Sequence, residues 1–286
     1  MRVSSRFVEV ADRVLLARYP QWDVGVGLVV GAERALVVDT RASDRAGREV
    51  LDDIRALGLG VPVTHVVNTH VHFDHTFGNV AFLGATVVAH EAVARSFTTA
   101  SERIKDAFRA DPFDAPEYGY TAADAADVVA TPLRGPDETF GSSLVVDLGG
   151  RQVRLTYAGR GHTDGDIAIV VPDAGAAFLG DLVEESGPPS VGADAWPLEW
   201  PATLDAHVAN LATAEVGVVV PGHGRPVDLA FVRQQRAELA AVAAVIRSRH
   251  AAGWPLEEAR RTPDPALPYP LELLGTAFDR GYAQWA

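Results

Sequence analysis

Cysteine is entirely absent from this chain of 286 residues. Its absence excludes disulfide bonds, thiolate nucleophiles, iron–sulfur clusters and cysteine-type zinc sites. Any metal ion that the protein binds must therefore be held by histidine, aspartate, glutamate or backbone oxygen.

Positive charge and long apolar runs are also scarce. Lys and Arg total 25 against 38 Asp and Glu, for a formal net charge of -13, whereas nucleic-acid-binding proteins gather cations to neutralise phosphates. No stretch approaches the roughly 20 apolar residues of a membrane span, and charged residues interrupt positions 1–19, where a signal peptide would need an apolar core. We therefore expect a cytoplasmic protein with a small-molecule substrate, no nucleic-acid or membrane partner, and homo-oligomerisation left open.

The composition that remains is that of an ordinary globular protein, with 48% hydrophobic and 22% charged residues. The first part of the chain predicts strands at 7–10, 14–18, 26–30 and 35–38. A helix capped by Ser43 or Asp44 then runs to about Leu57, and a β-branched strand follows at 63–68. This strand–helix–strand order is typical of α/β proteins.

The rest of the chain is more varied. After a strand at 86–89, the pattern predicts a helix at 91–110 and an irregular, partly helical stretch at 111–141. Strands at 143–147, 152–157, 167–171 and 176–179, a proline-rich loop at 187–201, a helix at 204–212, a strand at 216–220 and a long helix from 228 to about 250 follow. We predict a single domain over 1–286, with an insertion at about 91–141 and a C-terminal helical segment at about 228–286.

The most informative segment, Thr69 to Asn79, directly follows the strand at 63–68. It holds three histidines and a carboxylate within six residues: His70, His72, Asp74 and His75. Such a cluster is costly inside a fold unless its polar atoms have a partner, and a metal ion is a partner that imidazole and carboxylate groups bind well. His70 and His72 share one side of an extended loop, whereas Asp74 and His75 begin a helical turn and can face a second ion.

Three later positions place one ligand-type side chain just beyond a predicted strand. They are His162 in Gly-Arg-Gly-His-Thr, Asp181 in Phe-Leu-Gly-Asp and His223 in Pro-Gly-His-Gly. A strand-end aspartate alone is usually a cap or turn residue. Because α/β folds build their sites at strand ends, these positions together with the first segment predict one metal centre.

The order His-x-His-x-Asp-His, Gly-His-Thr, Gly-Asp and Gly-His-Gly resembles the metallo-β-lactamase-fold superfamily of hydrolases, over about Phe7 to Val227. The resemblance implies an α/β four-layer αβ/βα sandwich with two metal sites at one edge between two facing sheets. It implies that the first site holds His70, His72 and His162, the second Asp74, His75 and His223, and that Asp181 bridges them. Asp164 departs from the family pattern, in which proline commonly follows Gly-His-Thr, and adds a charge near His162.

The chain is therefore expected to be a binuclear metal-dependent hydrolase. Zinc is the expected metal, with iron or manganese as alternatives. A hydroxide held between two ions would attack a polarised carbonyl, one ion would stabilise the oxyanion, and Asp74 would orient the hydroxide and pass on its proton. The expected substrate is a small ester, thioester, lactone or lactam; a glyoxalase-II-like thioesterase is one form, although the C-terminal arginines form no clear glutathione-binding cluster.

Two other classes of function are alternatives to this hydrolase. A mononuclear iron oxidoreductase of the persulfide-dioxygenase type would use the first site on the same fold. Flavodiiron-type relatives differ, because they carry Glu where this chain has His72 and need a flavin domain for which there is no room. A non-catalytic metal-binding protein is the second class, and the intact ligand set argues against it, because Asp74 has little structural purpose without catalysis.

Several further side chains need an interpretation. His65 is expected to be a hydrogen-bonded core residue and His90 to begin a helix, whereas His207 and His250 are expected to be solvated on helices. Asp39 is expected to support a turn or to accept the second ring N–H of a ligand histidine.

The aromatic residues allow two interpretations. Trp196 and Trp200 either line the substrate pocket or pack their loop against the core. Five aromatic residues between 91 and 141 either form a lid over the metals or pack among themselves: Phe97, Phe108, Phe113, Tyr118 and Tyr120. We expect the insertion, the loop at 184–201 and the C-terminal helices to build the pocket.

Overall fold

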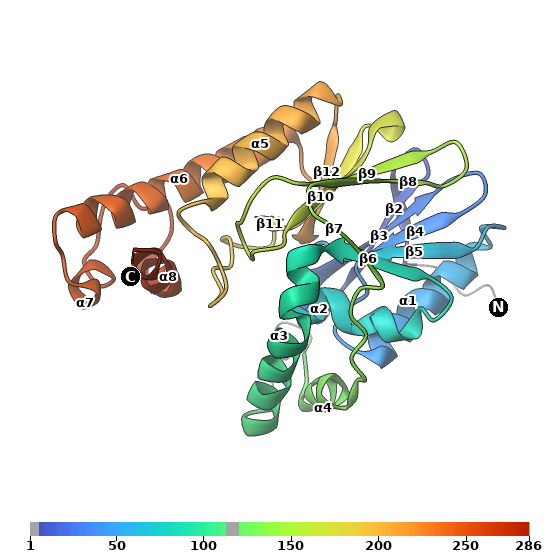
Figure 1. Ribbon diagram of the computed structural model, residues 1–286, viewed down its shortest axis with the longest axis horizontal. Helices are drawn as coiled ribbons and strands as arrows, with labels where there is room; N and C mark the ends of the chain where they lie inside the picture. The colour runs from blue at the N-terminus through green and yellow to red at the C-terminus, as the bar shows by residue number, and fades with distance from the viewer. Residues whose placement is uncertain (1–5, 113–119, 286) are drawn as a thin grey trace.

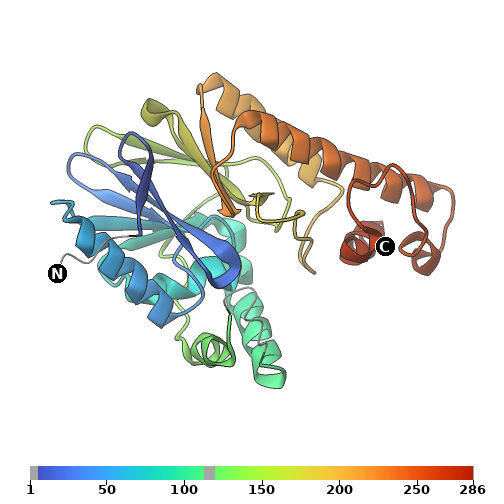
Figure 2. The same cartoon turned by 180° about the vertical axis from the view of Figure 1, so that it is seen from behind.

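The structure, a computed structural model, describes residues 6–112 and 120–285. Its strands form one hydrogen-bonded path in the order β7-β6-β5-β4-β3-β12-β11-β10-β9-β8, and β2 and β1 continue from β3 (Figures 1 and 2). The strands are β1 (Val8–Ala11), β2 (Val14–Tyr19), β3 (Val24–Val30), β4 (Ala35–Val38), β5 (Val63–Val67), β6 (Thr86–His90), β7 (Glu138–Phe140), β8 (Ser143–Asp147), β9 (Gln152–Tyr157), β10 (Ile167–Val171), β11 (Ala176–Glu184) and β12 (Val218–His223). The longer helices are α1 (Asp44–Leu57), α3 (Glu91–Ala110), α5 (Trp200–Thr213) and α6 (Leu229–Ala251).

The strand path consists of two halves that meet at a single residue pair, His223 with Val24. In each half, successive side chains point to opposite faces. Leu36 and Val38 enter a core shared with Phe178 of the other half, whereas the alternate residues of the same strands pack outward. The outward residues of the first half lie against α1, and those of the second half lie against α5 and α6. The four layers of the predicted αβ/βα sandwich are therefore confirmed.

Most predicted boundaries agree with the structure within a few residues. The helix α1 has Ser43 as its N-cap, whose hydroxyl accepts a hydrogen bond from the Ala46 amide, and it ends at Gly58 with a φ of 63°. The largest difference is β11, which continues to Glu184 instead of ending at Leu179. The register shifts at Gly180, whose φ of 51° lets the strand pass Thr69 closely before it continues.

The segment after α3 is partly helical, as predicted. Its helix α4 (Ala122–Ala130) begins with a capping box between Thr121 and Asp124, and β7 then extends the first half of the sheet in parallel to β6. Of the five aromatic residues considered for a lid, Phe113 and Tyr118 lie outside the described residues. Phe97, Phe108 and Tyr120 are buried in small apolar clusters, which favours packing over the lid interpretation for these three.

The C-terminal helices form an arm beside the second half of the sheet. The helix α6 runs alongside α5 and reaches beyond it to α7 (Leu256–Ala259) and α8 (Gly275–Ala283) (Figure 1). Arg247 and Arg280 of this arm donate hydrogen bonds to the carbonyls of Leu198 and Ala195, in the loop that follows β11. Among the described residues, no helix combines the length and the apolar character of a membrane span.

Candidate metal centre

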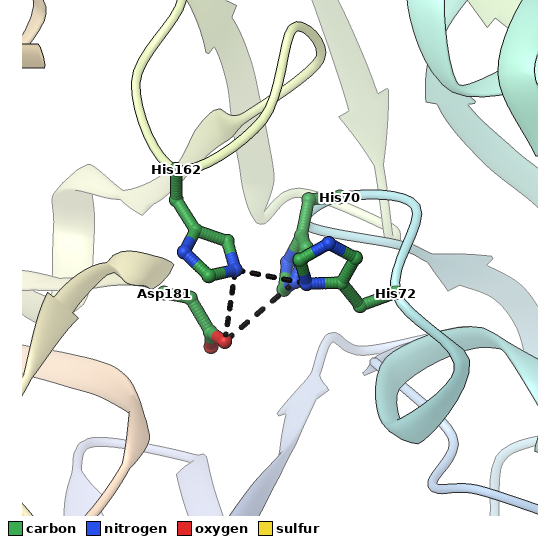
Figure 3. A group of neighbouring side chains, drawn as sticks. All are labelled: His70, His72, His162 and Asp181. Atoms are coloured by element: carbon green, nitrogen blue, oxygen red, sulfur yellow. Dashed lines mark hydrogen bonds and ion pairs between the residues drawn. The ribbon is translucent and has the colours of Figure 1, made fainter. Parts of the chain in front are cut away.

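The first of two ligand groups contains His70, His72, His162 and Asp181 (Figure 3). His162 Nε2 lies 2.9 Å from His72 Nδ1. Asp181 Oδ2 lies 3.4 Å from His162 Nε2 and 3.7 Å from His70 Nε2. One ligand atom from each of the four side chains lies within 4.8 Å of all the others, so a single ion can contact the whole group.

The second group contains Asp74, His75 and His223. Asp74 Oδ2 lies 3.5 Å from His75 Nε2 and 3.4 Å from His223 Nε2. Asp181 also reaches this group, because its two oxygens lie 3.2 Å from His75 Nε2 and 3.3 Å from His223 Nε2. The carboxylate of Asp181 therefore stands between the two groups.

Different elements bring these seven side chains to the edge where the halves of the sheet meet. His70 and His72 lie in the loop after β5, and Asp74 and His75 in the short helix α2 (Phe73–Thr76) that follows it. The others come from the β9–β10 turn, β11 and the end of β12. Close packing requires glycine at position 222, because a Cβ there would lie 1.8 Å from Asp181 Oδ1. All seven predicted site residues are thus brought together.

The second ring nitrogen of each histidine has an oxygen partner away from the centre. Because these oxygens accept hydrogen bonds, each partnered nitrogen carries a proton, and the other nitrogen faces the centre. The outer contacts join His70 Nδ1 to Thr69 Oγ1 at 3.0 Å, His75 Nδ1 to Asp39 Oδ2 at 2.9 Å, His162 Nδ1 to the Ser190 carbonyl at 3.0 Å, His223 Nδ1 to the Trp22 carbonyl at 2.6 Å, and His72 Nε2 to Asp194 Oδ2 at 3.1 Å.

Asp39 both supports a turn and accepts the second ring N–H of a histidine of the centre, which are the two roles expected for it. Its φ of 61° marks a turn at the end of β4, and its buried carboxylate accepts hydrogen bonds from His75 and from the amide and hydroxyl of Thr69. Thr69 donates its hydroxyl proton to Asp39, so its oxygen is available to accept the N–H of His70. One carboxylate therefore orients a histidine in each ligand group.

Asp194 has a similar role but was not predicted from the sequence. It lies in the irregular loop after β11, where neither periodicity nor a motif distinguishes it from other polar residues. Besides His72, it contacts Arg103 of α3, whose guanidinium lies 3.6 Å away. Burial raises the pKa of Asp194, but the hydrogen bond from His72 outweighs burial and lowers it.

Asp166, and not Asp164, supports the turn that carries His162. Its carboxylate accepts hydrogen bonds from the amide and the hydroxyl of Thr163. Burial raises the pKa of Asp166 to about 7 despite these bonds. Asp164 contributes its backbone carbonyl, which accepts a hydrogen bond from the Tyr157 hydroxyl.

The electrostatics of the centre favour positive charge. Burial raises the pKa of Asp74, but His75 and His223 outweigh burial and lower it to about 2. Conversely, burial lowers the pKa values of His75 and His223, but Asp181 and Asp74 outweigh burial and raise both well above the usual range. The buried carboxylates of this group thus draw protons onto histidines, as they would draw a metal cation.

The residues fit a divalent metal ion in a further respect. His70 Nε2 and Asp181 Oδ1 are buried in the centre without a hydrogen bond to any described residue. Burial also lowers the pKa of His162 to about 4, which leaves its inner nitrogen unprotonated. Unprotonated imidazole nitrogens and ionised carboxylates without sulfur are a ligand set for zinc and similar borderline cations.

The histidines outside the centre follow the predictions in part. His90 caps α3 as predicted, with Nδ1 accepting a hydrogen bond from the Ala92 amide. His65 is hydrogen-bonded to Thr64 but is only partly buried. His250 is partly buried and stacks on Trp285. The prediction for His207 is wrong, because its side chain is fully buried and neither ring nitrogen has a partner among the described residues.

The two tryptophans pack the loop that contains Asp194. Trp200 is fully buried, its indole N–H donates to the Leu182 carbonyl, and its ring meets His162 edge-on at 5.6 Å. Trp196 lies under the guanidinium groups of Arg160 and Arg280, at 3.6 and 5.4 Å from its ring centroid. Trp200 thus supports a ligand histidine from behind, which agrees with the packing interpretation.

The chain is similar to known proteins in sequence and in fold. Residues 21–223 match the family described as the metallo-beta-lactamase superfamily. A metallo-beta-lactamase type 2 of Bacteroides fragilis is 27% identical over 199 residues, which are 69% of this chain and 67% of the relative. A hydroxyacylglutathione hydrolase of Erythrobacter litoralis is 30% identical over 140 residues, but these are 48% of this chain and 40% of the relative.

The fold extends to the C-terminal arm in one solved structure. The stereoselective inverting sec-alkylsulfatase of a Pseudomonas species superposes with a TM-score of 0.74, covering 98% of this chain and 50% of its own, at 16% sequence identity. That likeness concerns the fold alone. The family match spans more than two thirds of the chain and includes all seven residues of the centre. The chain therefore belongs to the metallo-beta-lactamase superfamily and is a metal-dependent hydrolase.

Proposed function

We propose that the protein binds two divalent ions, most simply zinc, and hydrolyses a small carbonyl compound. His70, His72 and His162 would hold one ion, Asp74, His75 and His223 the other, and Asp181 would contact both. The observation that carries the proposal is the convergence of these side chains, in two adjoining groups, on a cavity of about 290 Å³. The cavity gives a substrate access to His72, Asp74, His162, Asp181 and His223.

Ions bound in such a centre lower the pKa of a water molecule to near neutrality and polarise a carbonyl oxygen. The chain's own contribution begins with Asp74. Its pKa of about 2 keeps the carboxylate ionised at neutral pH, so it can orient a water molecule and accept a proton at Oδ2. Asp39 and Asp194 keep the ligand histidines oriented.

The proposed substrates are esters, thioesters, lactones and lactams. The relatives named a metallo-beta-lactamase and a hydroxyacylglutathione hydrolase support this range. The net charge of -13 argues against a phosphodiester in a nucleic acid. The same proposal includes a single folding unit over 1–286 and a cytoplasmic location, which limited proteolysis and cell fractionation can test.

The direct test is a panel of chromogenic esters, thioesters, lactones and a cephalosporin, assayed with protein of measured metal content. We expect hydrolysis of at least one carbonyl class by protein with two zinc ions per chain. Activity should disappear with a chelator and return with Zn²⁺. Fully loaded protein that never exceeds one ion per chain would contradict the binuclear proposal, and an iron content of one would favour the mononuclear oxidoreductase.

A further inference from the structure

We propose that the substrate carries an aliphatic acyl chain, which binds in a second cavity beside the metal centre. This inference rests on the proposed hydrolysis of a carbonyl compound and narrows its substrate class. The second cavity measures about 420 Å³ and lies between α3 and the loop residues Gly192–Asp194. Its volume falls within the roughly 300–1,000 Å³ range of small-molecule pockets.

The two cavities adjoin at the centre. His72, Asp74 and Gly192 line both of them. A substrate whose carbonyl lies beside Asp74 can therefore place its acyl chain in the second cavity without crossing the protein. The cavity of about 290 Å³ at the metal ligands, here called the polar cavity, would then receive the carbonyl group. The second cavity would receive the acyl chain.

The character of the walls differs between the cavities. Val71, Phe73 and Ile104 give the second cavity an apolar surface, and Ala100 and Ala107 leave space along the side formed by α3. By contrast, metal-ligand and other polar side chains dominate the polar cavity. Apolar walls favour hydrocarbon because its transfer from water is favourable, whereas a glutathione moiety would bury charged groups there without partners.

Two polar features add to this assignment. Ser101 is one of the residues that line the same cavity, but its hydroxyl oxygen is buried and therefore adds no exposed polar group to the wall. Arg103 also lines the cavity and is 58% exposed, and it lies 3.6 Å from Asp194. Because Asp194 already lies beside the Arg103 guanidinium, the described residues that line the cavity include no unpaired cation that would favour an anionic group over a hydrocarbon chain.

A chain-length series tests the proposal through hydrolysis. With p-nitrophenyl acetate, butyrate, hexanoate and octanoate, we expect kcat/KM to rise by up to about fourfold per added methylene, from ~0.8 kcal/mol for each CH₂ buried. Ala100→Leu should fill the cavity and lower the octanoate-to-acetate ratio at least tenfold. Ala94→Leu adds the same side chain to an exposed position of α3 outside the cavity and should leave the ratio unchanged. Ala107→Leu repeats the test at an exposed position, in case Ala100→Leu folds poorly.

A binding measurement separates this inference from the proposed function. Calorimetry on chelator-treated protein compares octanoate with acetate, which share one carboxylate and differ only in the chain. We expect octanoate to bind tighter, by a factor of up to about 4 × 10³ if all six additional CH₂ groups are buried at ~0.8 kcal/mol each, and this advantage should shrink in Ala100→Leu. Equal binding of the two acids, together with a flat chain-length series, would overturn the acyl cavity. Preferential octanoate binding without hydrolysis of any carbonyl compound would support the cavity and contradict the proposed function instead.

Discussion

The two ligand groups share the support of Asp39 but are otherwise held from different parts of the molecule. In the first group, the outer partners of His72 and His162 are Asp194 and the Ser190 carbonyl, both in the loop between β11 and α5. In the second group, the outer partners lie beside β3 and β4, in the first half of the sheet. The second group is thus held by turns at the ends of two strands of the sheet, whereas the first depends in part on a longer irregular loop.

That loop is in turn attached to the C-terminal arm through Arg247 and Arg280. A change in the arm can therefore reach the first ligand group without touching the second. The two proposed ions, although they would share Asp181, should therefore respond to different substitutions.

The largest effect is expected from Asp74→Asn. The change keeps the size of the side chain but removes the charge and the proton acceptor, so kcat should fall by a factor of about 10²–10⁴. Metal analysis and circular dichroism should show that the fold is retained. Asp164→Asn is the matched control, since Asp164 contacts Tyr157 through its backbone. Turnover like that of the wild type in well-folded, metal-loaded Asp74→Asn would remove Asp74 from the mechanism.

The second prediction concerns the buried His207, which should make the free energy of unfolding depend on pH without involving the metal centre. Burial lowers the pKa of His207 in the folded protein to about 4, while the unfolded chain has an ordinary value of about 6.5. Between these values the unfolded state binds the proton and the folded state does not. Stability should therefore fall by up to about 3 kcal/mol as pH decreases from 6.5 to 4, and should change no further from this group below pH 4.

Urea unfolding of chelator-treated protein at several pH values measures this effect. His207→Leu and His207→Gln should both flatten the pH dependence relative to the wild type, because neither side chain titrates. An identical pH dependence in all three proteins would show that His207 does not take up a proton on unfolding.

His207 also shows where the sequence contained a signal that the prediction missed. Leu204, His207 and Leu211 are spaced three and four residues apart, so they share one helix face, and all three are buried. The predicted solvation of His207 gave its polarity more weight than this spacing. By contrast, the segment from His70 to His75 was interpretable because strand and helix geometry alone determine which way its side chains point.

Other parts of the centre could not be found in the sequence. The carbonyls of Trp22 and Ser190 are groups that any residue offers, so only the path of the backbone selects them. Asp194 and Asp166 depend on the shapes of a loop and a turn, and Asp164 was an equally reasonable candidate from the sequence. The strand–helix–strand order predicted the α/β class, whereas the four layers were implied by the family resemblance. They form because the strands carry apolar side chains on both faces of each half of the sheet.

The difference between the two ligand groups can be tested directly with Asp39→Asn and Asp194→Asn. Loss of a carboxylate that orients a ligand histidine typically costs 10- to 100-fold in metal affinity. Asp39→Asn should mainly lower the affinity for the ion of the second group. Asp194→Asn should lower only the affinity for the ion of the first group. Zn²⁺ titration against a competing chelator resolves the two steps, and His223→Ala and His162→Ala identify which step belongs to which group. If Asp194→Asn lowers the affinity for both ions equally, the two groups do not respond separately.

The smallest effect is expected from Arg280→Gln, which acts on the first group through the loop alone. Arg280 Nε donates a hydrogen bond of 2.9 Å to the Ala195 carbonyl, next to Asp194. Loss of one such bond costs about 1 kcal/mol, so affinity for the first ion should fall roughly fivefold, with the second ion unchanged. Arg261→Gln is the control, because Arg261 pairs with Glu257 at the far end of the arm. If Arg280→Gln lowers the melting temperature but leaves both metal affinities unchanged, the arm stabilises the fold without orienting His72. Metal binding at the first group would then depend on the loop but not on the arm.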